Sequence, residues 1–312
     1  MYRVILYYKF YTIEYPNQFC LKHKEKCQGL GLKGRVYIAS EGINGTLAGE
    51  SEAISQYKKY LSSINGFENT EFKEDIFSEL PFQDLRVKTR PEIVSLKASV
   101  SVDPSRESGG KYLEPHQWRQ ILESGRAYTL LDVRNNYESA IGHFKGAITP
   151  DVENFFDFEK WLDQNRLDKN KKVLMYCTGG IRCEKFSVLM RKKGYQDVYQ
   201  LQGGIINYAQ KEKGAHFCGK CFVFDDRLAV TVNPDEQEPI ARCEMTGVPC
   251  DQYLNCANIE CNRLFICSPE AAIKGQGCCS EDCRRAKRLR PLDPNNIYAP
   301  SRRWHWYLSD KG

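Results

Sequence analysis

The residues best suited to chemistry lie in one short run, Lys172–Phe186, which reads KVLMYCTGGIRCEKF. The pattern predicts an apolar strand that ends at Cys177 and a helix that begins just after Arg182. Two glycines in the intervening loop let backbone amides and the helix N-terminus point at the Cys177 sulfur, or at an anion bound to it. A thiolate placed there beside Arg182 has a lowered pKa and is a nucleophile at neutral pH. The alternative, an inert buried thiol, explains neither the glycines nor the arginine.

We therefore assign catalysis to Cys177 and Arg182, and substrate binding to the loop residues between them, Thr178, Gly179, Gly180 and Ile181. Asp132 and Arg134 end another predicted strand, where α/β sheets place functional side chains, so we also expect them to bind substrate. The alternative for this pair is an ion pair that orders the loop. Cys183 fits a helix-packing residue better than a resolving thiol. His143 fits a structural hydrogen bond better than acid–base catalysis.

Cysteines are concentrated in the last third of the chain. Of the 14 cysteines, ten lie between Cys218 and Cys283. No secretory signal precedes them, so a reducing compartment and metal or thiol chemistry are favoured over a disulfide framework. Four thiolates around Zn²⁺ would stabilise a region with few apolar residues, although the spacing does not assign which four, and disulfides or free thiols are the alternatives. The pairs with ligand-like spacing are Cys218-x2-Cys221, Cys256-x4-Cys261 and Cys279-x3-Cys283.

The elements that must position these groups fall into three predicted domains. Residues 1–98 contain strands and helices in the β-α-β-β-α-β order of a ferredoxin-like α+β domain. A linker rich in Ser, Gly and Pro follows. Buried strands at Thr129–Val133 and Lys172–Tyr176, each followed by a helix pattern, predict a parallel α/β sheet in residues 110–215. Residues 216–312 form a Cys-rich, basic C-terminal region.

Basic residues gather at the end of the chain. The whole sequence has a net charge of +5, and residues 284–312 carry eight Lys or Arg against two acidic residues. Basic side chains pair with phosphates and exposed aromatic rings stack on unpaired bases, so this segment suits an RNA loop; a solvated charged surface is the alternative. The residues that combine both features are Arg302, Arg303, Trp304 and Trp306.

Composition excludes several classes of protein. Hydrophobic residues make up 41% of the chain and charged residues 27%, which excludes a mainly disordered or collagen-like chain. No apolar run is long enough to span a membrane, and the N-terminal residues are charged too early for a signal peptide. The sequence therefore predicts a cytoplasmic protein without a membrane partner.

A series of motifs resembles a rhodanese domain over residues 110–215. The six residues from Cys177 to Arg182 are similar to the loop of sulfur-handling rhodaneses, whereas the related dual-specificity phosphatases have one more residue to fit phosphate. The resemblance implies a rhodanese-like α/β fold and argues against phosphatase activity. The other motifs are Leu131-Asp132-Val133-Arg134, Glu138, Gly142-His143-Phe144-Lys145-Gly146-Ala147 and Gly203-Gly204-Ile205.

Flanking motifs extend the resemblance to nearly the whole chain. GRVYIASEGINGT at 34–46, RVKTR at 86–90 and NCAN at 255–258 are together similar to the bacterial tRNA uridine hydroxylase family. That resemblance implies oxygen-dependent formation of 5-hydroxyuridine at position 34 of tRNA, with Cys177 as the active-site residue. It makes O₂ the co-substrate and the anticodon region of tRNA the partner. No dinucleotide or flavin motif is recognisable, and no protein partner is predicted.

We also expect RNA contacts from Arg35, Asn44, Lys88 and Arg90, which lie in the two N-terminal motifs. Lys88 and Arg90 alternate with Arg86 on an extended segment, so these side chains share a face. A β-turn around Asn44 and a solvated edge strand are the alternatives. Two other functions stay open: a sulfurtransferase that carries a persulfide on Cys177, and a non-enzymatic RNA-binding protein.

Overall fold

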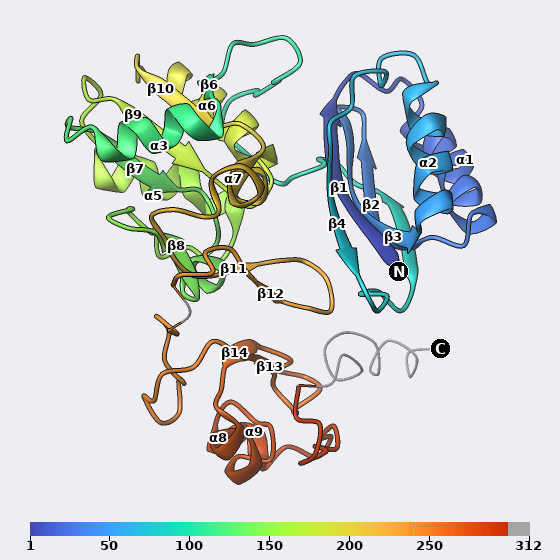
Figure 1. Ribbon diagram of the computed structural model, residues 1–312, viewed down its shortest axis with the longest axis vertical. Coiled ribbons are helices and arrows are strands. Elements are labelled where there is room, and N and C mark those ends of the chain that lie inside the picture. The colour runs from blue at the N-terminus through green and yellow to red at the C-terminus, as the bar shows by residue number, and fades with distance from the viewer. Residues whose placement is uncertain (237, 299–312) are drawn as a thin grey trace. The chain divides into compact units, whose positions relative to one another are not determined.

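The computed structural model describes residues 1–236 and 238–298, which form two compact units (Figure 1). The first unit consists of Met1–Asn136 and Gly146–His216, and the second of Tyr137–Lys145 with the residues from Phe217 onward. The predicted boundary at residue 215 lies one residue from this division. The predicted linker near residue 100 lies within the first unit, and the segment Tyr137–Lys145 interrupts the region that the sequence assigns to one domain.

The predicted β-α-β-β-α-β order of the N-terminal region is confirmed. Its strands pair antiparallel in the order β4-β1-β3-β2, as in a ferredoxin-like fold, and β5 pairs parallel with β2 at the edge. The elements are β1 (Tyr2–Phe10), α1 (Pro16–Gly29), β2 (Lys33–Ala39), β3 (Gly42–Glu50), α2 (Ser51–Ser62), β4 (Phe72–Phe77) and β5 (Leu85–Thr89).

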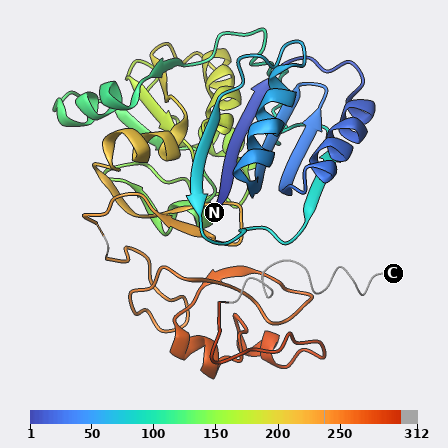
Figure 2. The same cartoon turned by 45° about the vertical axis from the view of Figure 1, so that its right-hand side comes forward.

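The side chains of β1 divide between the two faces of this sheet. Helices α1 and α2 lie on the same face (Figure 2), where Ile5 and Tyr7 are fully buried in a common apolar core with residues of both helices. Because side chains alternate along a strand, Leu6 and Tyr8 point to the opposite face. This second face of the sheet meets the central part of the chain.

The central part of the first unit contains a parallel sheet with the strand order β6-β10-β9-β7, which confirms the predicted α/β class. Its strands are short and mostly buried. Because they run parallel, their carboxyl ends meet at one edge of the sheet, where loops carry functional groups. The elements are β6 (Lys111–Leu113), α3 (Pro115–Glu123), β7 (Thr129–Asp132), η1 (Phe155–Asp157), α5 (Phe158–Asn165), β9 (Val173–Tyr176), α6 (Ile181–Lys192), β10 (Val198–Leu201) and α7 (Gly204–Glu212). Helix α4 (Asn136–Ser139) follows β7 and lies mostly in the second unit.

The second unit is built from short strands and helices around its own apolar core. Strand β8, from the motif at Gly142, pairs antiparallel with β11, and β12 extends this sheet. In residues 1–236 and 238–298, no helix is long and apolar enough to cross a membrane. The elements are β8 (Gly142–Phe144), β11 (Phe217–Phe222), β12 (Ala229–Thr231), β13 (Tyr253–Asn255), β14 (Leu264–Ile266), α8 (Pro269–Lys274) and α9 (Glu281–Arg284).

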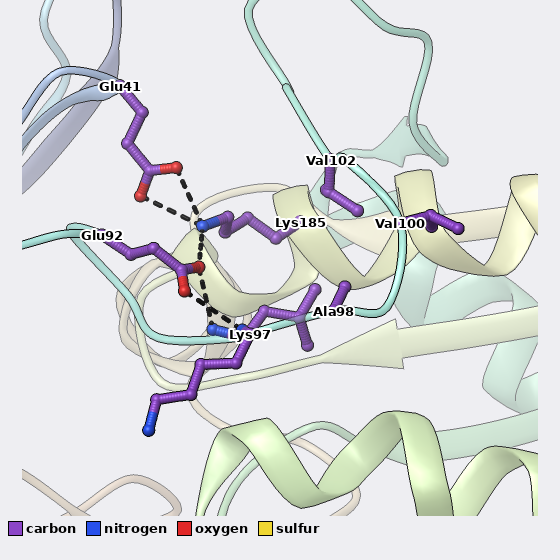
Figure 3. A pocket seen from close by; sticks show the side chains of 8 residues that line it. Glu41, Glu92, Lys97, Ala98, Val100, Val102 and Lys185 are labelled. Carbon is purple, nitrogen blue, oxygen red and sulfur yellow. Dashed lines mark hydrogen bonds and ion pairs between the residues drawn. The ribbon is translucent and has the colours of Figure 1, made fainter.

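A buried lysine on α6 joins the central part to the N-terminal domain (Figure 3). Lys185, whose side chain is 3% exposed, forms ion pairs with Glu41, at 2.8 Å, and with Glu92. Glu41 lies in the turn between β2 and β3, and its carboxylate also accepts a hydrogen bond from the backbone of Ile93. The three charged side chains line a small cavity of about 190 Å³. A single ammonium group therefore pairs with two carboxylates from two other segments of the chain.

Replacing this lysine should destabilise the first unit. In Lys185→Met, Glu41 and Glu92 lose their shared cation, and we expect a loss of about 2 to 3 kcal/mol in the free energy of unfolding, less than for a fully buried pair. The matched control is Lys192→Met on the same helix, whose pairing with Glu107 is more exposed, so its loss should stay below about 1 kcal/mol. Urea unfolding measures both. Equal losses of stability in the two variants would contradict the role of Lys185 as the shared cation of Glu41 and Glu92.

Candidate active site

Cys177 lies directly after β9, at the carboxyl edge of the parallel sheet, and its side chain is fully buried. The backbone amide of Gly180 donates to the Cys177 sulfur at 3.1 Å. The prediction that helix α6 begins just after Arg182 is corrected. The helix begins at Ile181, two residues earlier, and Arg182 is its second residue. The N-terminus of α6 is thereby closer to the sulfur than the sequence pattern indicates.

The surroundings of Cys177 favour its thiolate. Burial by itself raises the pKa of a thiol, but the hydrogen bond from Cys183, the charge of Arg182 and the backbone amides of both residues lower the pKa of Cys177 to about 5. Arg182 is nearly buried and donates to the hydroxyl of Thr178 at 3.3 Å. The predicted roles of Cys177 as a nucleophile and of Arg182 as its charge partner are thus compatible with the geometry.

Cys183 has a role that the sequence does not reveal. It is fully buried in α6, as a packing residue would be, yet its thiol also donates a hydrogen bond to Cys177. Burial raises the pKa of Cys183 well above its ordinary value, and so do the hydrogen bond to Cys177 and the nearby thiolate charge. Cys183 therefore stays protonated at neutral pH and stabilises the Cys177 anion as a donor.

The two loop glycines are required because β1 of the N-terminal domain lies against them. A Cβ atom on Gly179 would lie 2.8 Å from the Leu6 side chain, and one on Gly180 would lie 2.8 Å from the Tyr8 hydroxyl. Gly180 also has a φ angle of +104°, which favours glycine. The loop that holds the thiolate is thus covered by residues that are distant in the sequence.

A polar cluster beside this loop was not identifiable from the sequence. Glu184, next to Cys183 on α6, accepts hydrogen bonds from Tyr8 and Tyr112, both at 2.9 Å, and from Gln200. Burial raises the pKa of Glu184, whereas burial lowers the pKa of the nearby Lys73. Tyr8, Lys73, Tyr112 and Glu184 line a cavity of about 340 Å³. The electrostatic influence of Cys177 reaches both Lys73 and Glu184.

Asp132 and Arg134 pair with each other in the interior, and their assignment to substrate binding stays a prediction. Both side chains are fully buried, and the Arg134 guanidinium donates to the Asp132 carboxylate at 2.8 Å. The Arg134 backbone amide donates to the same carboxylate. The alternative interpretation, an ion pair that orders the loop, fits this geometry. The Nδ1 atom of His143 donates a structural hydrogen bond to the backbone carbonyl of Ser139 at 2.9 Å.

The residues expected to contact RNA lie in different environments. Lys88 and Arg90 are exposed at the edge strand β5 and just after it, and Arg90 also lies over the Tyr37 ring. Asn44 is half-buried and its amide donates to the Ile93 carbonyl at 3.0 Å, so it serves the fold. Arg35 is half-buried on β2. Outside the described residues lie Arg302, Arg303, Trp304 and Trp306.

The structure places the three cysteine pairs with ligand-like spacing differently. Cys218 and Cys221 both lie within strand β11, and among the described residues neither belongs to a group of sulfur atoms close enough to hold a metal ion. Metal binding by the cysteines stays a prediction at this point.

The ionisation of Cys177 should be measurable directly. The ultraviolet absorbance of its thiolate, taken as the difference from Cys177→Ser, should reach half of its maximum near pH 5. Cys183→Ala removes a donor to the thiolate, and Arg182→Gln removes a positive charge, so each should raise this midpoint by about 1 unit or more. Cys20→Ser on α1 is the control and should leave it unchanged. A midpoint above pH 8 in the unmodified protein would contradict the stabilised thiolate.

Comparison with known proteins agrees with the three parts of the chain. Residues 2–93 match the family model of the UPF0176 acylphosphatase-like domain, residues 114–211 that of the rhodanese-like domain, and residues 218–284 that of the rhodanese C-terminal region. A solved rhodanese-like domain from Anabaena sp. is 28% identical, covers 35% of this chain and 78% of its own, and has a TM-score of 0.30.

Full-length relatives are more informative. A protein of Bacillus cereus named tRNA uridine(34) hydroxylase is 43% identical over 93% of this chain and 91% of its own length. A protein of the same name from Staphylococcus aureus is 43% identical over 95% of this chain and 93% of its own. Identity at this level over nearly the whole of both chains shows that the chain belongs to the tRNA uridine(34) hydroxylase family.

Proposed function

We propose that this protein hydroxylates C5 of uridine 34 in tRNA and that Cys177 is its catalytic residue. The observation that carries the proposal is a fully buried cysteine whose pKa is lowered to about 5 at the start of a helix. Membership of the tRNA uridine(34) hydroxylase family supplies the reaction and the substrate. Because tRNA modification takes place where tRNA is used, we place the protein in the cytoplasm.

The anionic sulfur is the reacting atom. Two chemistries fit it, addition of the thiolate to C6 of uracil and formation of an oxygenated sulfur, and both begin from the thiolate. Arg182, Cys183 and the Gly180 amide hold this form in place, which is their role in either chemistry. The loop thus supplies a nucleophile that needs no separate base to deprotonate it.

We further propose that O₂ supplies the oxygen atom. Replacing the C5 hydrogen by a hydroxyl group places one oxygen atom in the base, and the second oxygen atom leaves as water. The second oxygen atom must take up two electrons and two protons to become water. We propose that a low-molecular-weight thiol supplies them and is oxidised to its disulfide. The stoichiometry is one uridine, one O₂ and two thiols to one 5-hydroxyuridine, one water and one disulfide.

The cavity beside the loop suits the base. A base must leave its stack to react, and an unpaired anticodon base does so at low energetic cost. The Lys73 ammonium, on the cavity wall, is suited to donate to a uracil carbonyl. Burial lowers the pKa of Lys73 and raises the pKa of Glu184, so both values move towards neutral pH. Groups that titrate closer to neutral pH are better suited to remove the C5 proton.

The tRNA backbone would meet exposed basic residues. Lys88 and Arg90 are exposed in the same unit as Cys177, which supports a phosphate contact by β5. Arg302, Arg303, Trp304 and Trp306 carry the charge and aromatic rings suited to an anticodon loop. Arg86, by contrast, pairs with Asp84 at 2.8 Å and is less suited to a phosphate.

Removing the sulfur should remove the activity. Cys177→Ser has a similar volume but lacks the low-pKa nucleophile, so it should form no 5-hydroxyuridine while keeping the fold. Mass spectrometry of nucleosides from tRNA incubated with pure protein and a thiol, with and without O₂, measures this. Cys183→Ser is the matched control, because its hydroxyl still donates to the thiolate, and it should retain most of the activity.

The same assay separates the rival functions. Full activity of Cys177→Ser would refute the catalytic role and favour a non-enzymatic protein. Release of sulfite from thiosulfate by the unmodified protein, without any 5-hydroxyuridine, would favour the sulfurtransferase. Product formation at the same rate without O₂ would contradict the proposed oxidant but leave the role of Cys177 intact.

The contribution of β5 to tRNA binding should appear in its salt dependence. Each phosphate contact releases counterions, so the double variant Lys88→Gln, Arg90→Gln should reduce the slope of log Kd against log salt by about 1 to 2 units. Lys59→Gln, an exposed lysine on α2, is the control and should leave the slope unchanged. Filter binding over a salt series measures both. An unchanged slope in the double variant would exclude β5 from the interface.

A further inference from the structure

Four cysteine sulfur atoms that are distant in the sequence come together in the second unit. The Sγ atoms of Cys256, Cys261, Cys279 and Cys283 all lie within 4.8 Å of one another. The Sγ atom of Cys279 lies 3.8 Å from that of Cys261 and 3.8 Å from that of Cys283. None of the four cysteines is part of a disulfide. We propose that these four thiolates bind one Zn²⁺ ion, which holds the C-terminal segment in its fold.

The spacing of the sulfur atoms matches a single tetrahedral ion. A regular tetrahedron with edges of 3.8 Å has its centre about 2.3 Å from each corner, which is the Zn–S distance of structural Cys₄ sites. A disulfide bond would need two sulfur atoms about 2 Å apart, which is much shorter than the 3.8 Å between these sulfur atoms. A ligand set of four thiolates also selects zinc over Mg²⁺ or Ca²⁺, which prefer oxygen ligands.

Neighbouring donors are placed as in metal sites. The backbone amide of Cys279 donates to the Cys256 sulfur at 3.4 Å, and the Asn258 side chain donates to the Cys283 sulfur at 3.5 Å. Such hydrogen bonds orient thiolate ligands and reduce their excess charge. Cys261 is exposed, so an ion can reach the site from solvent, while Cys256 is buried in the apolar core of the unit.

The local fold needs a cross-link of this kind. Helix α9 has four residues and buries none of them, and an isolated helix of that length is not stable in water. The sulfur of Cys283 links α9 to Cys279 and to the Asn258 side chain. A zinc ion would tie α9 to the turn that follows β13, where Cys256 and Cys261 lie.

The surrounding charge suits the ion and its ligands. Zn²⁺ with four thiolates has a net charge of −2, because binding releases the four thiol protons. Basic side chains follow closely in the same segments: Arg263, Arg284, Arg285, Lys287 and Arg288. The site lies apart from Cys177 in sequence and takes no part in the proposed hydroxylation, so the inference goes beyond that function.

Elemental analysis of the purified full-length protein tests the inference. We expect one zinc per chain after extensive dialysis, and none in the double variant Cys279→Ser, Cys283→Ser. Cys218→Ser, a partly exposed cysteine of the same unit outside the cluster, is the control and should keep the full amount. Full zinc in the double variant, or metal-free unmodified protein that is folded by circular dichroism, would overturn the proposal. Iron with inorganic sulfide in place of zinc would overturn it too.

A second measurement decides the case if the double variant does not fold. Cobalt added to the unmodified protein, after chelation of its metal, should give the visible absorption of a tetrahedral Co²⁺–thiolate complex. Cys283→His should keep one metal ion, because Cys₃His is a common zinc ligand set, but should change the cobalt spectrum through loss of one thiolate. Identical cobalt spectra in Cys283→His and in the unmodified protein would place the metal elsewhere.

Discussion

A negative charge without contact to water must be satisfied by the protein itself, and the buried thiolate of Cys177 imposes this requirement on the first unit. Leaving such a charge unpaired would cost several kcal/mol, so a group in that position normally stays neutral. Here the Gly180 amide, the Arg182 charge and the Cys183 thiol all act on the sulfur. All three belong to the loop and the first turn of α6, so β9 must end and α6 must begin within a few residues.

The same turn of α6 also fixes the N-terminal domain. Glu184 accepts from Tyr8 on β1, and the next residue, Lys185, pairs with Glu41 in the turn between β2 and β3. The residues that stabilise the thiolate and those that join the two parts of the unit are therefore consecutive in one helix. Any shift of this helix would change the electrostatics of the sulfur and the domain contact together. This coupling links the turn at Glu41 to the loop at Cys177, although the two lie far apart in sequence.

The sequence predicts those parts of the site that depend on local patterns. The strand, glycine loop and helix around Cys177, and the order of strands and helices along the N-terminal domain, follow from apolar periodicity and turn residues. The Glu184 cluster could not be predicted, because Tyr8 and Glu184 are 176 positions apart and only the tertiary fold brings them together. The burial of Asp132 and Arg134 could not be predicted either. Charged side chains of these types can bind a ligand, and only the structure shows that the two pair with each other. Among the cysteines, spacing alone could not show that the sulfur atoms of Cys256, Cys261, Cys279 and Cys283 come together, because the fold brings the two halves of this group together.

Full burial of Cys177 also limits which molecules reach it in this conformation. Cys177 is fully buried, and Leu6 and Tyr8 lie against the loop glycines, so a uracil ring can approach the sulfur only if side chains around the loop move. The neighbouring cavity is bounded by Tyr8 itself, together with Lys73 and Glu184. Binding of a base in that cavity would therefore act on the side chain that covers the loop. The N-terminal sheet therefore contributes to the surroundings of Cys177: one face packs on its own helices, and the other supplies Tyr8, which lies against the loop and also lines the neighbouring cavity.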